Sequence, residues 1–396
     1  MEDMKIRLDQ ISILADRLEA RRSDLEEAAA LDAGFPVKIT DMEVNLAVRH
    51  LRTMEEEIPW IEGKRPFGVI AAIFPYDAPA VMLARVGGAA IITGNRLRFS
   101  FSSLTPRSAA VISEICGPLP ALEPMVGMNN REFGDRCVRD DSVRVLFMSG
   151  ASPVGEAYRE HRRAFDKLFF AGPGGMPAVI VFEDADIDAA TRFIARRAFI
   201  NGGQYCTTLK KALIHRSLYD RVRDGVLRSA GDLRVGDPLD PVTDIGPIRI
   251  ERTRLILEKA LKKCSDARLL SGEVSGETVH PFILELETGC EIPDMELFGP
   301  FLLLKPFDNP DTAVQELIAT RYGFLLTFFG SVSDETRGIF NKHFGMVYDN
   351  PDFFFAPLRA PFGGKKESGW IIERRGIRWT TRDGTFLYSK ELARSD

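Results

Sequence analysis

One cysteine stands in a segment whose neighbours suit a reactive thiol. Cys206 follows the glycine-rich turn Asn201–Gln204 and precedes two threonines. A cysteine in such a loop is accessible, and nearby backbone N–H groups can lower the pKa of its thiol. An ionised thiol is a strong nucleophile. Taken alone, the pattern is more typical of a structural cysteine, so the interpretation depends on the motifs that accompany it.

Four further motifs occur in order along the chain. Together with GQYCTT around Cys206, they are Gly68–Pro79 (GVIAAIFPYDAP), Val235–Pro247 (VGDPLDPVTDIGP), Glu296–Pro300 (ELFGP) and Pro361–Gly369 (PFGGKKESG). The set resembles the aldehyde dehydrogenase superfamily from about residue 40 to about residue 390. The resemblance implies that Cys206 attacks an aldehyde carbonyl, that a hydride passes to NAD or NADP, and that a thioester on Cys206 is then resolved.

The same resemblance implies a set of cofactor contacts. Glu296 is expected to contact the nicotinamide ribose, with Phe298 packed beside it. Ser149 and Gly150 form the turn before a helix on the cofactor side. The other residues expected at the cofactor are Phe74 and Ser100. Read without the resemblance, Glu296 could simply cap a helix or form an ion pair, and the glycine could only shape a turn.

The first departure from the family pattern is Asp77. Related sequences usually have an asparagine here, which donates a hydrogen bond to the oxyanion, whereas this chain reads Pro75-Tyr76-Asp77. An ionised carboxylate only accepts hydrogen bonds, so it would repel an oxyanion unless its pKa were strongly raised. We assign Asp77 to the catalytic site. The alternatives are that it orients a cationic substrate or caps a helix beginning at Pro79.

The second departure lies at the adenosine end of the expected cofactor site. Related sequences carry Lys-Pro-Ser-Glu where this chain has Ser100–Ser103. Loss of the glutamate removes a charge that repels a 2′-phosphate, which slightly favours NADP over NAD. Loss of the lysine weakens the contact to either cofactor. Arg96 and Arg98 lie nearby in the sequence but could point elsewhere.

The third departure concerns release of the acyl group. Ala171 stands where related sequences have a glutamate that activates water, and alanine cannot act as a base. The segment Ala171–Gly175 is more similar to that of the CoA-acylating aldehyde dehydrogenases, in which coenzyme A accepts the acyl group. The sequence around Cys206, in contrast, has the form of the hydrolytic branch. We expect transfer to coenzyme A slightly ahead of hydrolysis.

These losses also support a hypothesis of another class. A degenerate family member could bind an aldehyde, a nucleotide or a partner protein without turnover, although the presence of Cys206 and Glu296 favours the enzyme. Residues 57–66 leave little room for the long hairpin that usually bridges subunits in the family. The stretch 384–391 resembles the family's terminal strand. A homo-oligomer, most simply a dimer, is the expected assembly.

The elements that must position these residues follow from the apolar pattern. Residues 3–30 and 40–57 predict helices, the second opened by a capping box of Thr40 and Glu43. Helices are also predicted over 217–232 and 251–263. The predicted strands are 67–74, 96–100, 142–148, 178–182, 211–215 and 282–286.

Strands that alternate with helices indicate an α/β fold with mostly parallel sheets. Together with the resemblance, this predicts a Rossmann-like cofactor domain over residues 1–173, a catalytic α/β domain over 174–370 and a C-terminal segment over 371–396. The active site is expected in the cleft between the domains. Phe353–Phe355 either line the substrate tunnel or belong to the core.

Composition excludes several other classes. The 396 residues carry a net charge of −5, which gives no basic footprint for nucleic acid. No apolar run approaches the ~18 residues of a membrane span, and the N-terminus lacks a secretory signal. The five cysteines and five histidines are not spaced as a metal site, so no metal is expected. The odd cysteine count, without CxxC spacing, favours a reducing cytoplasmic compartment.

Overall fold

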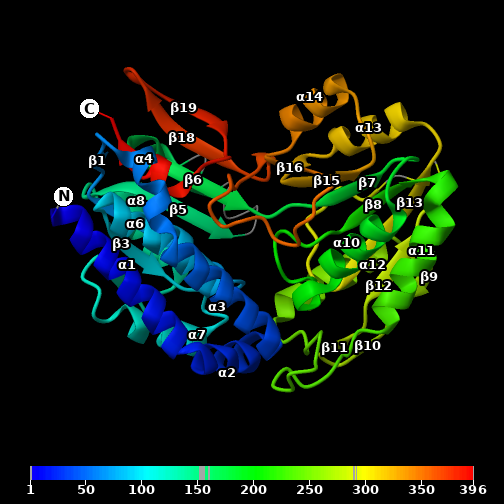
Figure 1. The fold of residues 1–396 in the computed structure, drawn as a ribbon, viewed down its shortest axis with the longest axis horizontal. Helices are drawn as coiled ribbons and strands as arrows, with labels where there is room; N and C mark the ends of the chain where they lie inside the picture. Colours follow the sequence, from blue (N-terminus) through cyan, green and yellow to red (C-terminus); the bar gives the residue numbers. More distant parts are fainter. Residues whose placement is uncertain (1, 151–156, 159–160, 289, 291, 396) are drawn as a thin grey trace.

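The computed structural model describes residues 2–150, 157–158, 161–288, 290 and 292–395. Within these ranges two seven-stranded sheets form, each covered by helices, and they face each other across the molecule (Figure 1). The predicted α/β class with mostly parallel sheets is confirmed. None of the described helices has the length and apolar content needed to cross a bilayer.

The first sheet has the strand order β19-β18-β6-β5-β2-β3-β4. These strands are β19 (Arg378–Asp383), β18 (Trp370–Arg375), β6 (Leu168–Pro173), β5 (Val143–Gly150), β2 (Val69–Ile73), β3 (Arg96–Ser100) and β4 (Leu122–Met125). Strands β2 to β6 are parallel, with β3 on one side of β2 and β5 on the other. The strand order therefore reverses beside β2, and the carboxyl ends of β2 and β5 border the crevice in which open α/β sheets bind ligands.

Helices cover both faces of this sheet. On one face lie α1 (Glu2–Ala20), α2 (Arg22–Ala33), α3 (Val37–Arg52), α6 (Gly88–Thr93) and α7 (Pro106–Cys116), whose apolar side chains form one core with those of β2 and β3. On the other face α8 (Asn130–Arg139) packs through Phe133 against Leu146 and Trp370. Small apolar residues fill β2, so the strand is buried from both sides.

Two predictions for the N-terminal helices are wrong. The helix expected over 3–30 is interrupted at Arg21. The capping box of Thr40 and Glu43 does not form, because α3 begins earlier, at Val37, after Pro36. Thr40 and Glu43 therefore lie inside the helix, on its buried face.

The second sheet has the strand order β16-β15-β7-β8-β13-β12-β9. Its strands are β16 (Met346–Asp349), β15 (Leu325–Phe329), β7 (Ala178–Val181), β8 (Lys211–His215), β13 (Phe301–Phe307), β12 (Phe282–Glu285) and β9 (Arg268–Ser271). All neighbouring pairs are parallel except β12 with β9. Helices α10 (Ile187–Phe199), α11 (Arg216–Gly231), α12 (Glu251–Lys263), α13 (Pro310–Ala319) and α14 (Asp334–His343) cover it.

Helix α10 shows how local sequence sets the position of Cys206. Asp186 caps its first turn by accepting a hydrogen bond of 2.9 Å from the N–H of Ala189. Its buried residues Ala190, Ile194 and Ala198 recur every fourth position and pack against the sheet. The helix ends at Phe199, a few residues before Cys206.

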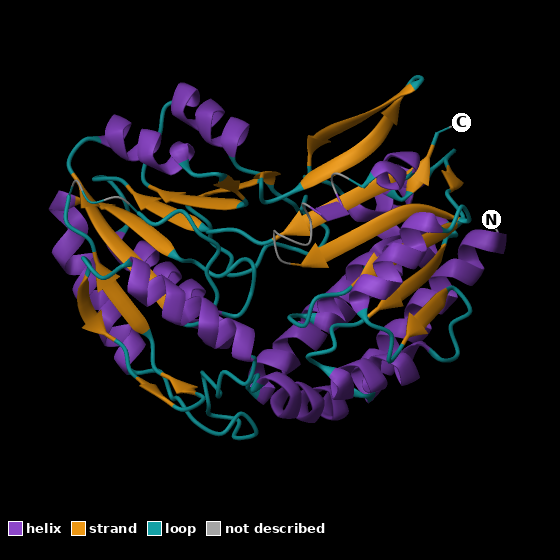
Figure 2. Ribbon diagram, turned by 180° about the vertical axis from the view of Figure 1, so that it is seen from behind, coloured by secondary structure: helices purple, strands orange, loops and turns teal. Residues whose placement is uncertain are grey.

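The C-terminal part of the chain returns to the first sheet. The chain leaves that sheet at Pro173, enters the second at Ala178 and comes back as β18 at Trp370. Strands β18 and β19 form an antiparallel hairpin that extends the first sheet beyond β6, as the upper right of Figure 2 shows.

The strand expected over residues 384–391 is not found. Residues Tyr388–Glu391 form the short helix α15. Phe386 and Tyr388 are buried and pack edge-on or tilted against Phe147, which fixes this segment against the sheet instead of beside it.

The remaining elements are short. They are η1 (Met54–Glu57), α4 (Ile58–Ile61), β1 (Arg65–Pro66), α5 (Pro79–Met82), η2 (Leu83–Gly87), η3 (Arg162–Asp166), η4 (Ile200–Gly203), β10 (Val274–Ser275), β11 (Thr278–Val279), β14 (Tyr322–Gly323), β17 (Lys365–Lys366) and β20 (Ala393–Arg394). The helical stretch expected directly after Gly150 falls mainly outside the described residues.

Candidate functional site

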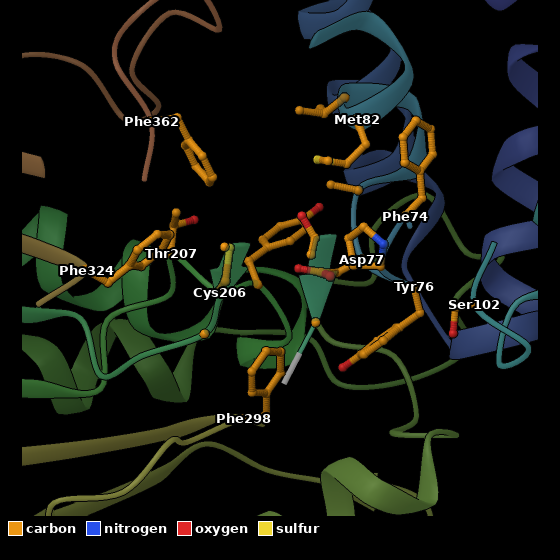
Figure 3. A pocket seen from close by; sticks show the side chains of 18 of the residues that line it. Phe74, Tyr76, Asp77, Met82, Ser102, Cys206, Thr207, Phe298, Phe324 and Phe362 are labelled. Atoms are coloured by element: carbon orange, nitrogen blue, oxygen red, sulfur yellow. The ribbon is translucent and has the colours of Figure 1, made fainter. Parts of the chain in front are cut away.

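A cavity of about 850 Å³ lies between the two sheets with their helices, which are called the first and second domains from here on. It receives Cys206 from the second domain and Asp77 from the first, and these two side chains lie next to each other in Figure 3. Most of the residues expected at the site line this cavity: Phe74, Asp77, Ser149, Gly150, Cys206, Glu296 and Phe298. Ser100 does not line it.

The backbone before Cys206 is tightly turned. Asn201, Gly202 and Gly203 have φ of 53°, 58° and 70°. The left-handed region favours glycine, and at Gly203 a Cβ would lie 1.9 Å from the carbonyl oxygen of Gly299. The turn therefore holds the loop that carries Cys206 against the loop that carries Glu296. The sequence signal for this arrangement is the glycine pair itself.

The surroundings of Cys206 favour the protonated thiol. Burial raises its pKa well above the ordinary value, and the nearby carboxylate of Asp77 raises it further. The guanidinium groups of Arg85 and Arg197 act in the opposite direction but do not overcome burial. Nucleophilic chemistry at this thiol consequently requires a group that accepts its proton.

Asp77 lies where it can serve as that group. It follows β2 through Pro75 and Tyr76, and its side chain is only 7% exposed. Burial raises its pKa to about 6, against the stabilising effect of the backbone N–H groups of Asp77 and Cys206. Helix α5 has Ala78 as its N-cap, with no side-chain capping bond, so Asp77 does not cap that helix.

Glu43 is a site residue that the sequence analysis missed. Its carboxyl group accepts a hydrogen bond from the hydroxyl of Tyr205, the neighbour of Cys206. Burial raises the pKa of Glu43 to about 8, so it is largely protonated at neutral pH. The available signal was the position of an acid among Ile39, Val44 and Ala47 on the apolar face of α3.

The cofactor side of the cavity lies at the carboxyl ends of the parallel strands. Ser149 and Gly150 end β5, and among the residues that the structure describes no atom lies within 4 Å of a Cβ placed on Gly150. A Cβ on Gly174 would lie 1.8 Å from Oε1 of Glu296, so the glycine makes room for this carboxylate. The strand-order reversal, the open space at Gly150 and the approach of Glu296 fit a nicotinamide dinucleotide.

The adenosine end departs from expectation in detail. Ser100 is fully buried, and its hydroxyl donates to Oδ1 of Asn130 at 2.8 Å, so Asn130 reaches the cavity in its place. Arg96 pairs with Glu123, and Arg98 pairs with Glu123 and Asp140. Neither arginine lines the cavity. A cation that does line it is Arg131, at the start of α8, which the sequence analysis did not single out.

Comparison with known proteins decides the family. The sequence profile of the aldehyde dehydrogenase family matches residues 3–385. The chain belongs to this family. The assignment made from the motifs is thus confirmed.

Individual relatives within the family are distant. Lactaldehyde dehydrogenase of Methanocaldococcus jannaschii is 27% identical over 396 residues, covering 93% of this chain and 84% of that protein. Sulfoacetaldehyde dehydrogenase of Neptuniibacter caesariensis is 28% identical, covering 83% and 72%. The crystal structure of an NADP-dependent enzyme of E. coli superimposes with a TM-score of 0.86 at 25% identity, covering 99% of this chain and 84% of that one.

Two features distinguish the site of this aldehyde dehydrogenase family member. Ala171 lies in β6 and is fully buried. The aromatic side chains of Phe324, Phe354, Phe355 and Phe362 line the other side of the cavity, while Phe353 packs against Tyr348 instead. The substrate side is therefore largely apolar, apart from Arg85 and Arg197.

Proposed function

We propose that the protein oxidises an aldehyde with NAD(P) through a thioester on Cys206. The observation that carries the proposal is the meeting of Cys206 and Asp77 in one cavity, which also receives Glu296 at the carboxyl end of a Rossmann-like sheet. Glu296, Phe298, Ser149, Gly150 and Phe74 would hold the dinucleotide, and Ser100 would act only by positioning Asn130.

Asp77 has two successive roles in this proposal. As a carboxylate with a pKa of about 6 it accepts the thiol proton of Cys206 when the sulfur attacks the aldehyde carbon. Once protonated, Asp77 can donate a hydrogen bond to the oxyanion that forms beside it. Asp77 would thereby serve both as the proton acceptor and as the hydrogen-bond donor to the oxyanion. Ala171 cannot provide the first function, and an asparagine usually provides the second.

Oxidation follows on the same sulfur. The bound dinucleotide supplies a hydride acceptor. When the carbon of the thiohemiacetal loses its hydride, the oxyanion collapses to a carbonyl and the C–S bond to Cys206 remains, which gives the thioester. Glu296, whose carboxylate reaches over Gly174, would orient the ribose next to this carbon.

Release of the acyl group to coenzyme A is favoured over hydrolysis. A thiol acceptor is a better nucleophile than water and needs less help from a base. Ala171 is buried and carries no base. Hydrolysis would instead require Asp77 to activate water after it has passed on the thiol proton.

NADP is favoured as the dinucleotide. No acid follows β3 in the segment 101–105, and Arg131 lines the cavity on the same side of the sheet. A guanidinium suits a 2′-phosphate, which a glutamate would repel. The related E. coli enzyme of known structure is NADP-dependent.

The assembly and the compartment complete the proposal. All five cysteines are free, which suits a reducing cytoplasm. Strand β19 is the edge strand of the first sheet, so its outer side has backbone groups with which a strand of a second copy could pair. Such pairing would give a dimer.

A rapid-mixing measurement of NAD(P)H absorbance tests this function. The enzyme, at a concentration close to that of the substrate, is mixed with an aldehyde panel and either cofactor, with and without coenzyme A. A stoichiometric burst that becomes turnover only with coenzyme A is expected, and Cys206→Ala should abolish it. Steady turnover without coenzyme A would overturn the acyl-transfer step.

The same measurement addresses the non-catalytic alternative. The non-catalytic alternative is favoured if no aldehyde gives a burst with either cofactor, because the replacements Asp77, Ser100 and Ala171 would then reflect lost catalysis. In that case alkylation of Cys206 distinguishes two forms of the alternative: protection by cofactor or aldehyde indicates binding without turnover, and no protection indicates a structural cysteine.

A further inference from the structure

Two buried guanidinium groups lie on the substrate side of the cavity. Arg85 comes from η2 in the first domain and is 9% exposed, and Arg197 comes from α10 in the second and is 4% exposed. Both line the cavity, and both are close enough to Cys206 for their charges to lower the pKa of its thiol. They therefore converge on the reacting sulfur from opposite domains.

Arg197 has no acidic partner among the residues that the structure describes. Its terminal nitrogens donate to the carbonyl oxygens of Thr207 at 2.6 Å and Phe354 at 3.4 Å. The groups that raise its pKa are Tyr348, Cys206 and Tyr205, and all three are uncharged at neutral pH. The rings of Phe354 and Phe355 lie 5.4 and 4.9 Å from the guanidinium carbon.

Arg85 is in a similar position. Its guanidinium carbon lies 4.3 Å from the ring centre of Phe362 and 6.0 Å from that of Tyr388. Its Nε is buried, with no hydrogen-bond partner in the described part of the chain. No ion pair joins Arg85 to a described acidic residue.

The nearby acids do not compensate these two charges. Glu57 is held by the hydroxyl of Ser389 and lies 3.4 Å from Nε of Arg359. The groups that shift the pKa of Asp77 include neither arginine. Glu43 is largely protonated at neutral pH.

Buried cations are normally paired, because desolvation of a single charge is strongly unfavourable. Here the space next to both guanidinium groups is the cavity itself. We propose that Arg85 and Arg197 together bind an anionic group at the end of the aldehyde opposite its carbonyl. This inference rests on the proposed oxidation at Cys206 and adds the chemical class of the substrate.

The class is an aldehyde that carries a carboxylate, sulfonate or phosphate. Each of these groups presents at least two oxygens, which suit the parallel N–H donors of guanidinium. Phe355, Phe362 and Tyr348 would pack around the carbon chain that links the anion to the carbonyl. The anion would compensate the two arginines, and the chain would lead from them to the sulfur.

The alternative is that both arginines serve only to lower the pKa of Cys206. The two roles differ in their effect on substrate choice. Loss of a group that only tunes the thiol slows charged and neutral aldehydes equally. Loss of a group that binds the anion slows charged aldehydes more, so the ratio of their kcat/KM values distinguishes the two.

Three matched aldehyde pairs provide that ratio. The pairs are 4-oxobutanoate with butanal, sulfoacetaldehyde with propanal, and glyceraldehyde 3-phosphate with glyceraldehyde, so the arms also distinguish the three anions. With NADP and coenzyme A, at least one anionic member should exceed its neutral partner about tenfold or more in kcat/KM. In Arg85→Met the ratio should fall about tenfold. Arg144→Met, which removes an exposed arginine of β5, should leave it unchanged.

A second arm does not depend on turnover. Alkylation of Cys206 by iodoacetamide, followed by mass spectrometry, is measured with butanoate, propanesulfonate or phosphate, and with the neutral butanamide. Protection by an anion, absent with butanamide and lost in Arg85→Met, supports the anion site even if no aldehyde is oxidised. If wild type has the same kcat/KM for the anionic and the neutral member of every pair, the inference is overturned while the oxidation itself stays intact. The same holds if none of the anions protects Cys206 in an enzyme that oxidises neutral aldehydes. Absence of both a burst and protection would overturn both.

Discussion

The ammonium group of Lys210 connects Gly299 to the loop that carries Cys206. Nζ of Lys210 donates to the carbonyl oxygen of Gly299 at 2.7 Å and to that of Gly203 at 2.8 Å. Lys210 is fully buried, and burial lowers its pKa to about 7. One side chain thus fixes the spacing between the loop that carries Cys206 and the loop that carries Glu296.

Lys210→Met should loosen this connection. The substitution keeps the length of the side chain but removes both hydrogen bonds, so we expect a loss of about 1–3 kcal/mol in the free energy of unfolding. The KM for the dinucleotide should rise at the same time, because Glu296 is no longer held at its distance from Cys206. Urea unfolding and steady-state kinetics measure the two effects.

The neighbouring Lys211→Met is the matched control. Lys211 is also buried, and in the described part of the chain its side chain makes no hydrogen bond. Its replacement should therefore leave the free energy of unfolding unchanged or raise it slightly. Equal losses in the two variants would contradict the role given to Lys210.

Asp77→Asn should separate the effect of this carboxylate on the thiol pKa of Cys206 from its role as the acceptor of the thiol proton. Removing a negative charge close to Cys206 lowers the pKa of the thiol, so alkylation of Cys206 at pH 8 should become about tenfold faster. The hydride-transfer burst should nevertheless become about 100-fold slower, because the proton acceptor is gone. In wild type the burst rate should rise with pH through about 6, where Asp77 ionises. Asp77→Asn should lack this rise.

Asp135→Asn provides a control within the same cavity. Asp135 lines the cavity but is not among the groups that shift the pKa of Cys206. If both variants change the alkylation rate alike, or if Asp77→Asn accelerates the burst, Asp77 is not the proton acceptor.

Glu43 should make the stability of the protein depend on pH. Its pKa rises from an ordinary value of 4.5 to about 8 on folding, so the folded state holds the proton more tightly than the unfolded state. The resulting stabilisation is fully present below pH 4.5 and is lost as the pH rises through about 8. Between pH 5 and pH 9 the wild type should therefore lose a few kcal/mol relative to Glu43→Gln.

Urea unfolding of both proteins at pH 5, 7 and 9 measures this difference. Tyr205→Phe, which removes the hydrogen bond but leaves the acid, should keep a pH dependence in the same direction. Parallel curves for wild type and Glu43→Gln would show that Glu43 does not retain its proton in the folded protein.

Arg131 should determine the choice of dinucleotide. Arg131→Gln removes a guanidinium that lines the cavity on the adenosine side, so the preference for NADP over NAD in kcat/KM should fall about tenfold. Arg96→Gln is the control, because Arg96 pairs with Glu123 and does not line the cavity. An unchanged ratio in Arg131→Gln would place the 2′-phosphate elsewhere.

Regular apolar patterns were sufficient to predict many elements. The strands Arg96–Ser100 and Lys211–His215 and the helix Glu251–Lys263 were predicted with their observed bounds, because glycine, proline or polar residues frame each run. Tertiary contacts override local signals elsewhere. Thr40 and Glu43 have the spacing of a capping box, but Glu43 is held by Tyr205 from the other domain, a contact that no local pattern contains.

The candidate site divides in the same way. Cys206, Asp77 and Glu296 stand in motifs and could be singled out from the sequence. Arg197 could not, because it follows the exposed Arg196 on the same helix and the sequence alone does not show which of the two faces the cavity. Arg85 lies in an apolar run in which only the opposing domain gives its charge a function.

The two segments that cross between the domains have a mechanical consequence. They lie side by side: a Cβ on Gly175 would be 2.7 Å from Oγ of Ser368, and this hydroxyl accepts the N–H of Gly323 at 3.2 Å. Two adjacent crossings form a single hinge line, so the domains can rotate about it but cannot slide past one another.

Such a rotation would change the gap between Asp77 and Cys206 directly. Three contacts away from the hinge resist this rotation. They are the hydrogen bond between Tyr205 and Glu43, the hydrogen bond of 3.1 Å between Tyr76 and Thr253, and the ion pair of 2.5 Å between Lys38 and Asp244. A rotation that opens the cleft must therefore break these three contacts. Opening of the cleft and separation of Asp77 from Cys206 would therefore be a single motion.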